Sequence, residues 1–338
     1  MRKILILLAI FVINISLILF SWHSYREFRR VEGVFVDLLE QAEKYKKEKR
    51  FRRVEEIYRR ILIEKPGYVE VKLGLAHVLR WIEKYDEAIA VYQEILRMQP
   101  TNTNILYHLG RVYIWEKEYD LAKKCFESIL EIKSDDLPAH FQLARVNLVK
   151  KNYGEVVNHY QKITMHPSGV TKFLLKYGVG YKWKEEYLEA LLRLGEVHLL
   201  RKEYREAINN LREFIDIHSK DEMPYFLLAK AYDENKQYDK ATGIYEELLE
   251  KYPDNMDIKA HLAMVYGWVK NFKKSMKLFQ EVIEKAPYHL EAQLGLARVY
   301  KWQGLMNQSF QILRKVALEY PQNQEVIEEY SDVKEKMK

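Results

Sequence analysis

The chain has 338 residues, a formal net charge of +6 and 31% charged residues. This small basic excess gives no general case for nucleic-acid binding, which is typical of markedly basic proteins. The single cysteine, Cys125, excludes an intramolecular disulfide and a zinc site built from several cysteines. Only 8 prolines and 13 glycines interrupt the chain, which favours a mostly helical protein with short turns.

The first predicted element is an apolar helix close to the N-terminus. Two basic residues precede an apolar run from Ile4 to Phe20, and Trp22 follows it. A helix of this length spans about 25 Å at ~1.5 Å per residue, close to the ~30 Å of a bilayer core. We therefore expect residues 1–30 to be an uncleaved membrane anchor and linker. A cleaved signal peptide is the alternative, although no small-residue cleavage pattern follows the run.

The membrane orientation follows from the positive charges that flank this run. The short basic N-terminal tail favours insertion into the inner (cytoplasmic) membrane, with the rest of the chain in the periplasm or otherwise outside the cytoplasm. Three arginines soon after the run leave the opposite orientation open.

A nine-residue pattern recurs along the rest of the sequence. It occupies Leu294–Trp302 (LGLARVYKW), and earlier versions lie at Leu73–Trp81, Tyr107–Trp115 and Ala260–Trp268. The first two versions in the chain are separated by the same interval as the last two, which is about 34 residues. A pattern that returns at this fixed period predicts a stacked array of helix pairs, in which each pair covers the apolar face of its neighbour.

The recurring residues resemble the tetratricopeptide repeat (TPR) family, whose pattern is W-x2-L-G-x2-Y, then A-x3-F, then P over about 34 residues. The pairs Leu75-Ala76 and Leu109-Gly110 match the first helix of that pattern. The resemblance implies an all-α fold, a right-handed α-solenoid of about eight helix-turn-helix TPR units. The leading tryptophan of the pattern is absent from every unit. Other residues replace the second-helix alanine in four units, namely Val54, Val156, Ser275 and Ser309.

The repeat register divides the chain into segments. Residues 35–170 hold TPR units 1–4, and residues 188–323 hold units 5–8. Residues 171–187 form an insertion, which is either a tolerated loop or extended helix pair, or a flap with exposed Tyr181 and Trp183. Residues 324–338 form a C-terminal capping helix, because apolar residues occupy one of its faces and charged residues the other.

The sequence contains no recognisable catalytic motif. A phosphate-binding loop, an H-E-x-x-H zinc motif and a G-x-S-x-G nucleophile motif are all missing. The array also leaves no room for a separate catalytic domain. We therefore expect no enzyme activity, no cofactor and no metal site.

The resemblance further implies a partner-binding groove, because arrays of this family bind partners on the concave face lined by the first helix of each pair. Basic residues outnumber acids at the groove positions, and none is an asparagine, which disfavours the peptide-carboxylate clamp of some co-chaperones. The tryptophans there either pack between helices or form aromatic platforms beside cations. The predicted groove residues are His77, Arg80, Trp81, Arg111, Trp115, Arg145, Lys230, Trp268, Arg298, Lys301 and Trp302.

These features predict a membrane-tethered scaffold that binds protein partners or peptide segments during assembly of a cell-envelope complex. The Arg-Val-Tyr-x-Trp pattern is similar to that of repeat proteins in bacterial polysaccharide export and outer-envelope assembly, so polysaccharide export or secretion is the expected setting. Direct binding of a glycan or another anionic ligand in the groove is one alternative. Regulation of an envelope-biosynthesis enzyme from the cytoplasmic side is another. No nucleic acid is expected as a partner.

Overall fold

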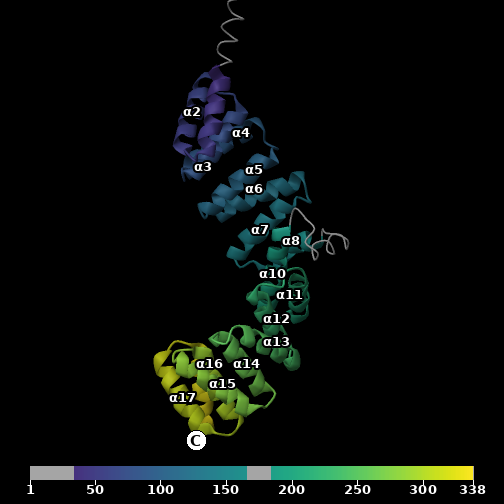
Figure 1. Cartoon of the computed structure of the whole chain (residues 1–338), viewed down its shortest axis with the longest axis vertical. Helices are drawn as coiled ribbons and strands as arrows, with labels where there is room; N and C mark the ends of the chain where they lie inside the picture. Colours follow the sequence, from purple (N-terminus) through teal and green to yellow (C-terminus); the bar gives the residue numbers. More distant parts are fainter. Residues whose placement is uncertain (1–33, 166–183, 338) are drawn as a thin grey trace, which may run out of the picture. The chain divides into compact units, whose positions relative to one another are not determined.

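The computed structural model describes residues 34–165 and 184–337, and the regular structure within these ranges is entirely helical (Figure 1). The helices form two compact units, one ending at Val146 and the other beginning at Asn147. The expected anchor and most of the expected insertion lie outside the described residues. Among the helices of the described ranges, none is both long and apolar enough to cross a bilayer.

Within each unit, helices that follow one another in the chain pack as neighbours (Figure 1). The N-terminal unit begins with helical residues 34–47. It continues with α2 (Phe51–Glu64), α3 (Val69–Trp81), α4 (Tyr85–Met98), α5 (Thr103–Trp115), α6 (Tyr119–Ile132) and most of α7 (Leu137–Val149). The C-terminal unit contains α8 (Tyr153–Met165), α10 (Lys184–Leu200), α11 (Tyr204–Ile217), α12 (Glu222–Glu234), α13 (Tyr238–Lys251), α14 (Met256–Trp268), α15 (Phe272–Lys285), α16 (Leu290–Trp302), α17 (Met306–Glu319) and α18 (Gln324–Lys336).

The start of α10 bears on the expected insertion at residues 171–187. The helix begins at Lys184, so the end of that segment forms its first turn. Tyr187 in this turn is fully buried. Residues 184–187 therefore belong to the helical array.

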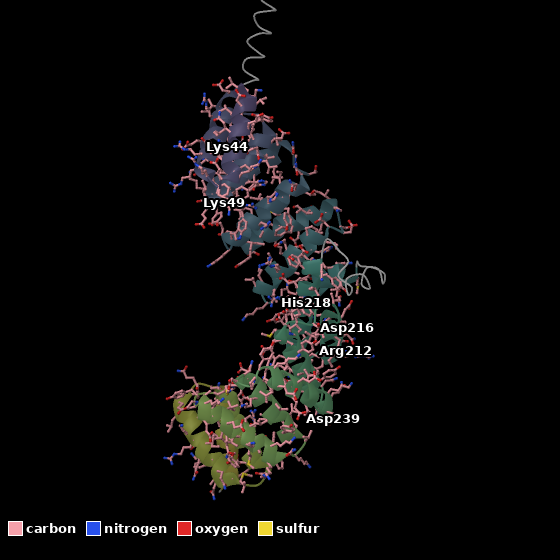
Figure 2. All side chains as sticks on the ribbon, viewed as in Figure 1. Lys44, Lys49, Arg212, Asp216, His218 and Asp239 are labelled. Atoms are coloured by element: carbon pink, nitrogen blue, oxygen red, sulfur yellow. The ribbon has the colours of Figure 1, made fainter. Side chains whose placement is uncertain are left out.

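A residue in the left-handed backbone conformation joins the two helices of each pair. These residues recur at one constant interval, except for a single longer interval that contains the undescribed residues 166–183. The repeat period of the sequence is thus also a period of the backbone. Figure 2 labels Lys49, the first residue of the series. The others are Glu83, Lys117, Lys151, Lys202, Lys236, Lys270 and Gly304.

Small residues are completely buried where the two helices of a pair meet. Ala76 of α3 and Ala88 of α4 are both 0% exposed. Ser275 and Ser309 stand where the repeat pattern has alanine, and they are equally buried. Their hydroxyls donate hydrogen bonds to the carbonyl oxygens of Ala263 and Ala297, at 2.6 and 2.8 Å. The serines are tolerated there because each polar group finds an acceptor on the first helix of its own pair.

A large side chain from each second helix fills the space beside these small residues. Tyr92, Phe126 and Phe279 are fully buried in this position, and each contributes about 1.5–3 kcal/mol through burial. The fit is close, because a Cβ added at Gly110 would lie 2.7 Å from Cζ of Phe126. A Cβ at Gly295 would collide with the ring of Phe279. These two glycines permit helix approaches that a side chain would prevent.

Helix α18 covers the end of the C-terminal unit. Val326 and Val333 on its inner face are fully buried and pack in one cluster with Leu313 and Val316 of α17. Asn323 caps the helix, because its side-chain oxygen accepts the backbone N–H of Val326 at 3.2 Å.

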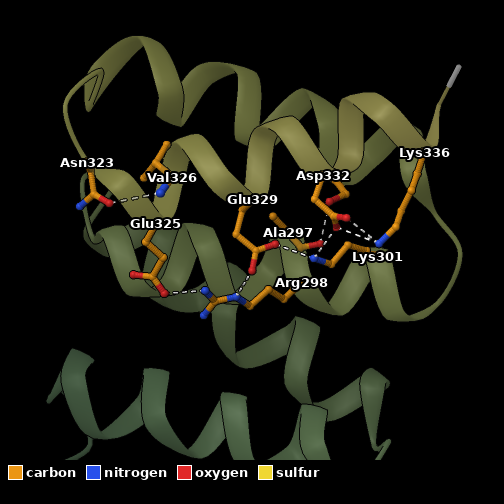
Figure 3. A network of polar contacts seen from close by, with 10 residues as sticks. Ala297, Arg298, Lys301, Asn323, Glu325, Val326, Glu329, Asp332 and Lys336 are labelled. Carbon is orange, nitrogen blue, oxygen red and sulfur yellow. Dashed lines mark hydrogen bonds and ion pairs between the residues drawn. The ribbon is translucent and has the colours of Figure 1, made fainter.

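Ion pairs tie α18 to α16 (Figure 3). Arg298 donates from Nε to Oε1 of Glu329 at 2.8 Å and from Nη2 to Oε1 of Glu325 at 2.5 Å. Lys301 donates from Nζ to Oε2 of Glu329 at 2.6 Å and to Oδ2 of Asp332 at 3.2 Å. Burial alone would raise the pKa of Glu329, but hydrogen bonds from Lys301 and Arg298 outweigh it and hold the pKa below its usual range.

This network changes the interpretation of Arg298 and Lys301, which we predicted to contact a partner. Carboxylates of α18 already neutralise both cations, so neither presents a free positive charge. The TPR pattern assigns no packing role to these two positions. The structure corrects that view, because both side chains hold the last helix in place.

We expect Glu329→Gln to lower the free energy of unfolding by about 1–3 kcal/mol, because Arg298 and Lys301 then lose their shared carboxylate. The folded-state pKa of Glu329 lies below its unfolded value, so this contribution is present at neutral pH and is lost as the pH falls through the folded-state pKa. Urea unfolding at neutral and at strongly acidic pH measures both effects.

The matched control is Glu328→Gln, an exposed position on the same helix, which should change stability by less than about 0.5 kcal/mol. An equal loss in the two variants, or a Glu329→Gln loss that persists in strong acid, would contradict the assigned role of Glu329.

Candidate functional site

Four of the predicted groove residues gather on α3 and α5, and we call this set, Arg80, Trp81, Arg111 and Trp115, the cationic surface. The guanidinium of Arg80 lies 5.9 Å from the ring centroid of Trp81 and 5.3 Å from that of Trp115. The guanidinium of Arg111 lies 5.3 Å from the Trp115 centroid. The two tryptophans remain 48% and 42% exposed. The surface therefore combines two cations with aromatic rings that solvent or a ligand can reach.

The positive charge of this surface is not compensated by the described residues. Neither Arg80 nor Arg111 forms an ion pair with any of them, and Nε and Nη1 of Arg80 are buried without an acceptor. Burial lowers the pKa of Arg80 below its usual range, and the neighbouring charge of Arg111 acts in the same direction. An anion bound here would offset the cost of burying the Arg80 charge and would reduce the repulsion between Arg80 and Arg111.

Two histidines extend the aromatic set beside Arg80. The ring centroids of His77 and His108 are 4.5 Å apart, and His108 stacks on Tyr92 at 6.2 Å. Burial, followed by the nearby Arg80, lowers the pKa of His77 to about 4. Burial, followed by His77, lowers the pKa of His108 to about 4 as well. Both imidazoles are therefore neutral at physiological pH and add no positive charge.

Each tryptophan of the cationic surface packs on an aromatic ring and remains partly exposed. Trp81 lies 4.8 Å from Phe51 of α2, between ring centroids, and Trp115 stacks on Tyr85 of α4 at 6.1 Å. The packing alternative raised by the sequence thus holds for one part of each ring, and the platform alternative stays a prediction for the exposed part.

The tryptophans of the C-terminal unit form a pair of their own. The ring centroids of Trp268 and Trp302 are 4.6 Å apart. Trp302 also packs closely on α14, because a Cβ added at Gly267 would lie 2.9 Å from its Cζ3 atom. Trp268 is 45% exposed and lines a cavity.

This cavity, which we call the acidic cavity, has a volume of about 690 Å³ and lies in the C-terminal unit. Its size falls within the ~300–1,000 Å³ typical of ligand sites. Helices α12, α14 and α16 and the start of α18 contribute most of the wall. Apolar and aromatic side chains there include Phe226, Met264, Trp268 and Leu294, and the charged lining consists of Asp233, Glu234, Asp257, Glu291, Glu325, Lys236 and Arg298, together with His261 and His289.

Carboxylates outnumber cations in the acidic cavity, in contrast to the basic groove that we expected. Arg298 is already engaged by carboxylates of α18, and His289 contacts Asp257 at 3.1 Å. Oδ1 of Asp233 is buried without a donor. Burial, followed by the charge of Glu234, raises the pKa of Asp233 to about 7. The basic excess that we counted at the predicted groove positions therefore does not extend to the lining of this cavity.

A repeated spacing in the sequence could have revealed part of the acidic lining. Asp257, Glu291 and Glu325 follow one another at the repeat interval, so they occupy the same position in successive repeats. The predicted groove positions lie near the middle and end of each first helix and therefore did not include this one. Asp233 has no such repeated spacing, and what distinguishes it is burial, which raises its pKa and leaves Oδ1 without a donor.

Two further predicted groove residues lie apart from both sites. Arg145 is exposed, and its guanidinium lies 5.7 Å from the ring centroid of Phe141. Lys230 is half-buried on α12 and is not part of the cavity lining. Neither therefore joins the cationic surface or the acidic cavity.

Two observations concern metal binding and thiol chemistry among the described residues. No group of three or more His, Cys, Asp or Glu residues within them is placed to hold a metal ion. Cys125 is buried, and burial raises the pKa of its thiol to about 11, so it is not a thiolate nucleophile at physiological pH.

Comparisons with known proteins agree with this repeat architecture. In the solved structures, the C-terminal part of a TPR repeat-containing protein from Cytophaga hutchinsonii is similar, with a TM-score of 0.54 and 18% identity, over 76% of this chain and 98% of that one. YrrB, described as a TPR protein with an unusual peptide-binding site, is similar with a TM-score of 0.49 and 16% identity, over 60% of this chain and 95% of its own. At 18% identity the likeness to the Cytophaga protein concerns the fold alone. No curated protein matches the chain.

The family comparison covers more of the sequence. The tetratricopeptide repeat model matches residues 83–163, 198–265 and 269–327, which together exceed half of the chain. These segments include most of the left-handed turns and many of the buried small residues described above. The chain therefore belongs to the tetratricopeptide repeat family.

Proposed function

We propose that this protein is a scaffold whose cationic surface binds an acidic segment of a protein partner. TPR domains bind protein or peptide partners, and TPR proteins are generally scaffolds without enzyme activity. The observation that carries the proposal is the pair Arg80 and Arg111, two guanidiniums beside half-exposed tryptophans with no carboxylate among the described residues to neutralise them.

The chemistry of this surface fits the side chains of aspartate and glutamate. A carboxylate accepts charge-assisted hydrogen bonds from a guanidinium, and such bonds are about twice as strong as neutral ones. Nε and Nη1 of Arg80 are buried, which leaves Nη2 as the atom open to a ligand. The exposed parts of Trp81 and Trp115 offer apolar contact to the methylene groups of the same segment.

Binding of a short repeating Ala-Ala-Glu peptide to the full-length chain, measured by isothermal titration calorimetry, tests this proposal. We expect the double substitution Arg80→Met and Arg111→Met to weaken binding by about tenfold or more, because two charge-assisted contacts are lost. The matched control replaces Arg60 and Arg97, two arginines of the same unit outside the cationic surface, with methionine. If both double substitutions weakened binding equally, the loss would come from the change in net charge alone, which would contradict a specific site at Arg80 and Arg111.

The aromatic rings also favour a second candidate function, direct binding of an anionic glycan. Sugar rings stack on exposed tryptophan faces, and their carboxylates pair with arginine. An oligosaccharide of galacturonate units serves as the probe in a parallel titration. Binding of this oligosaccharide, lost with Arg80 and Arg111, together with no binding of the acidic peptide, would favour the glycan function over the peptide function.

The proposal also includes a membrane tether and a role in assembling a cell-envelope complex for polysaccharide export or secretion. The apolar run at residues 4–20 supports the tether, and the similarity of the Arg-Val-Tyr-x-Trp pattern to envelope repeat proteins supports the setting. We expect protease added to intact spheroplasts to digest the repeat region. Complete protection of that region would contradict the external placement and favour a cytoplasmic regulator of an envelope-biosynthesis enzyme.

A further inference from the structure

We infer that the acidic cavity of the C-terminal unit is a second binding site, which accepts a lysine or arginine side chain from a basic segment of a protein partner. This inference shares no residue with the cationic surface, so either site can fail its test without the other. The occupant follows from charge, from the position of the carboxylates on their helices, and from the aromatic wall.

Helix stability does not explain why two carboxylates, Asp233 and Glu234, end α12. Both lie in the last turn of α12, where the partial negative charge of the helix end disfavours carboxylates. Asp257, Glu291 and Glu325 differ, because each lies in the first turn of its helix, where a carboxylate is favourable. The pair on α12 therefore costs stability in the unliganded protein, and a bound cation would offset that cost.

Polar groups behind the cavity wall also lack partners. Tyr245 is fully buried, and its hydroxyl has no hydrogen-bond partner in the structure. Its ring stacks on His261 at 5.9 Å and meets Phe226 at 6.1 Å, two residues of the cavity lining. Oδ1 of Asp233 is likewise buried without a donor. The Tyr245 hydroxyl can donate as well as accept, so Oδ1 of Asp233 is the acceptor that lacks a donor here, and an N–H group of a ligand would supply one.

The apolar part of the wall fits the rest of a basic side chain. Trp268 is 45% exposed and lines the cavity together with Phe226 and Met264. Lysine and arginine carry long apolar stems below their charged groups, and such stems pack on apolar and aromatic surfaces while the cation lies near a ring face. An acidic segment would meet the unneutralised carboxylates of this cavity and be repelled.

The test titrates the full-length chain with a short repeating Ala-Ala-Lys peptide by calorimetry at about pH 8, above the pKa of about 7 that burial gives Asp233, so that this carboxyl is ionised. We expect Asp233→Asn combined with Glu234→Gln to weaken binding by at least about tenfold, because the cation loses its nearest uncompensated charges. These substitutions keep the side-chain shapes. The control pair is Asp216→Asn with Glu250→Gln, which removes the same charge from positions of this unit that do not line the cavity (Asp216 is labelled in Figure 2).

A second variant, Trp268→Leu, keeps every charge and removes the aromatic face. We expect it to weaken binding of the basic peptide while leaving the binding of the acidic peptide unchanged. Circular dichroism establishes that each variant is folded. Absence of binding by the unaltered chain, or equal affinity in the cavity variant and its control, would overturn the inference. Loss of basic-peptide binding on replacing Arg80 and Arg111 would also overturn it, because binding would then occur elsewhere.

Discussion

The fold depends on a close approach between helices that only small residues permit. Where the two helices of most pairs meet, both contribute buried small residues, although Val54 and Val156 occupy this position in two pairs. A large side chain from the second helix fills the adjoining space. Gly110 shows how little room remains, because even one added carbon would overlap the ring of Phe126. This contact recurs with the period of the left-handed turns, so one local arrangement builds both units.

This packing assigns fixed residue types to the inner face of each first helix and leaves the other face free to differ between repeats. The N-terminal unit carries Arg80 and Arg111 on that face without compensating carboxylates among the described residues. The C-terminal unit places Asp233 and Glu234 beside a cavity in which the cation Arg298 is already engaged. One repeated scaffold therefore displays two chemically opposite surfaces, and the difference lies in residues that the fold does not require.

The sequence predicted the features that depend on period and residue size. The helical repeat, the buried alanines and the aromatic residues beside them follow from the recurring pattern, because these contacts lie within one repeat or between adjacent repeats. The substitution of serine at positions 275 and 309 was also identified, although the hydrogen bonds that make it tolerable were not.

The features that the sequence did not predict depend on which side chains meet in space. Arg298 and Lys301 looked like free groove cations because their acceptors belong to α18, which follows a whole intervening helix later in the chain. The raised pKa of Asp233 arises from burial, which no motif encodes. The small net charge of the whole chain likewise did not reveal that one unit carries the cationic surface and the other the acidic cavity.

Photo-crosslinking tests the separation of these two sites most directly. Acidic and basic peptides, each with a central diazirine group, would be irradiated with the full-length chain, and the attachment points mapped by mass spectrometry. Our account predicts that the acidic peptide attaches to α3 and α5, whereas the basic peptide attaches to α12 and α14. Attachment of both peptides to the same helices would contradict it.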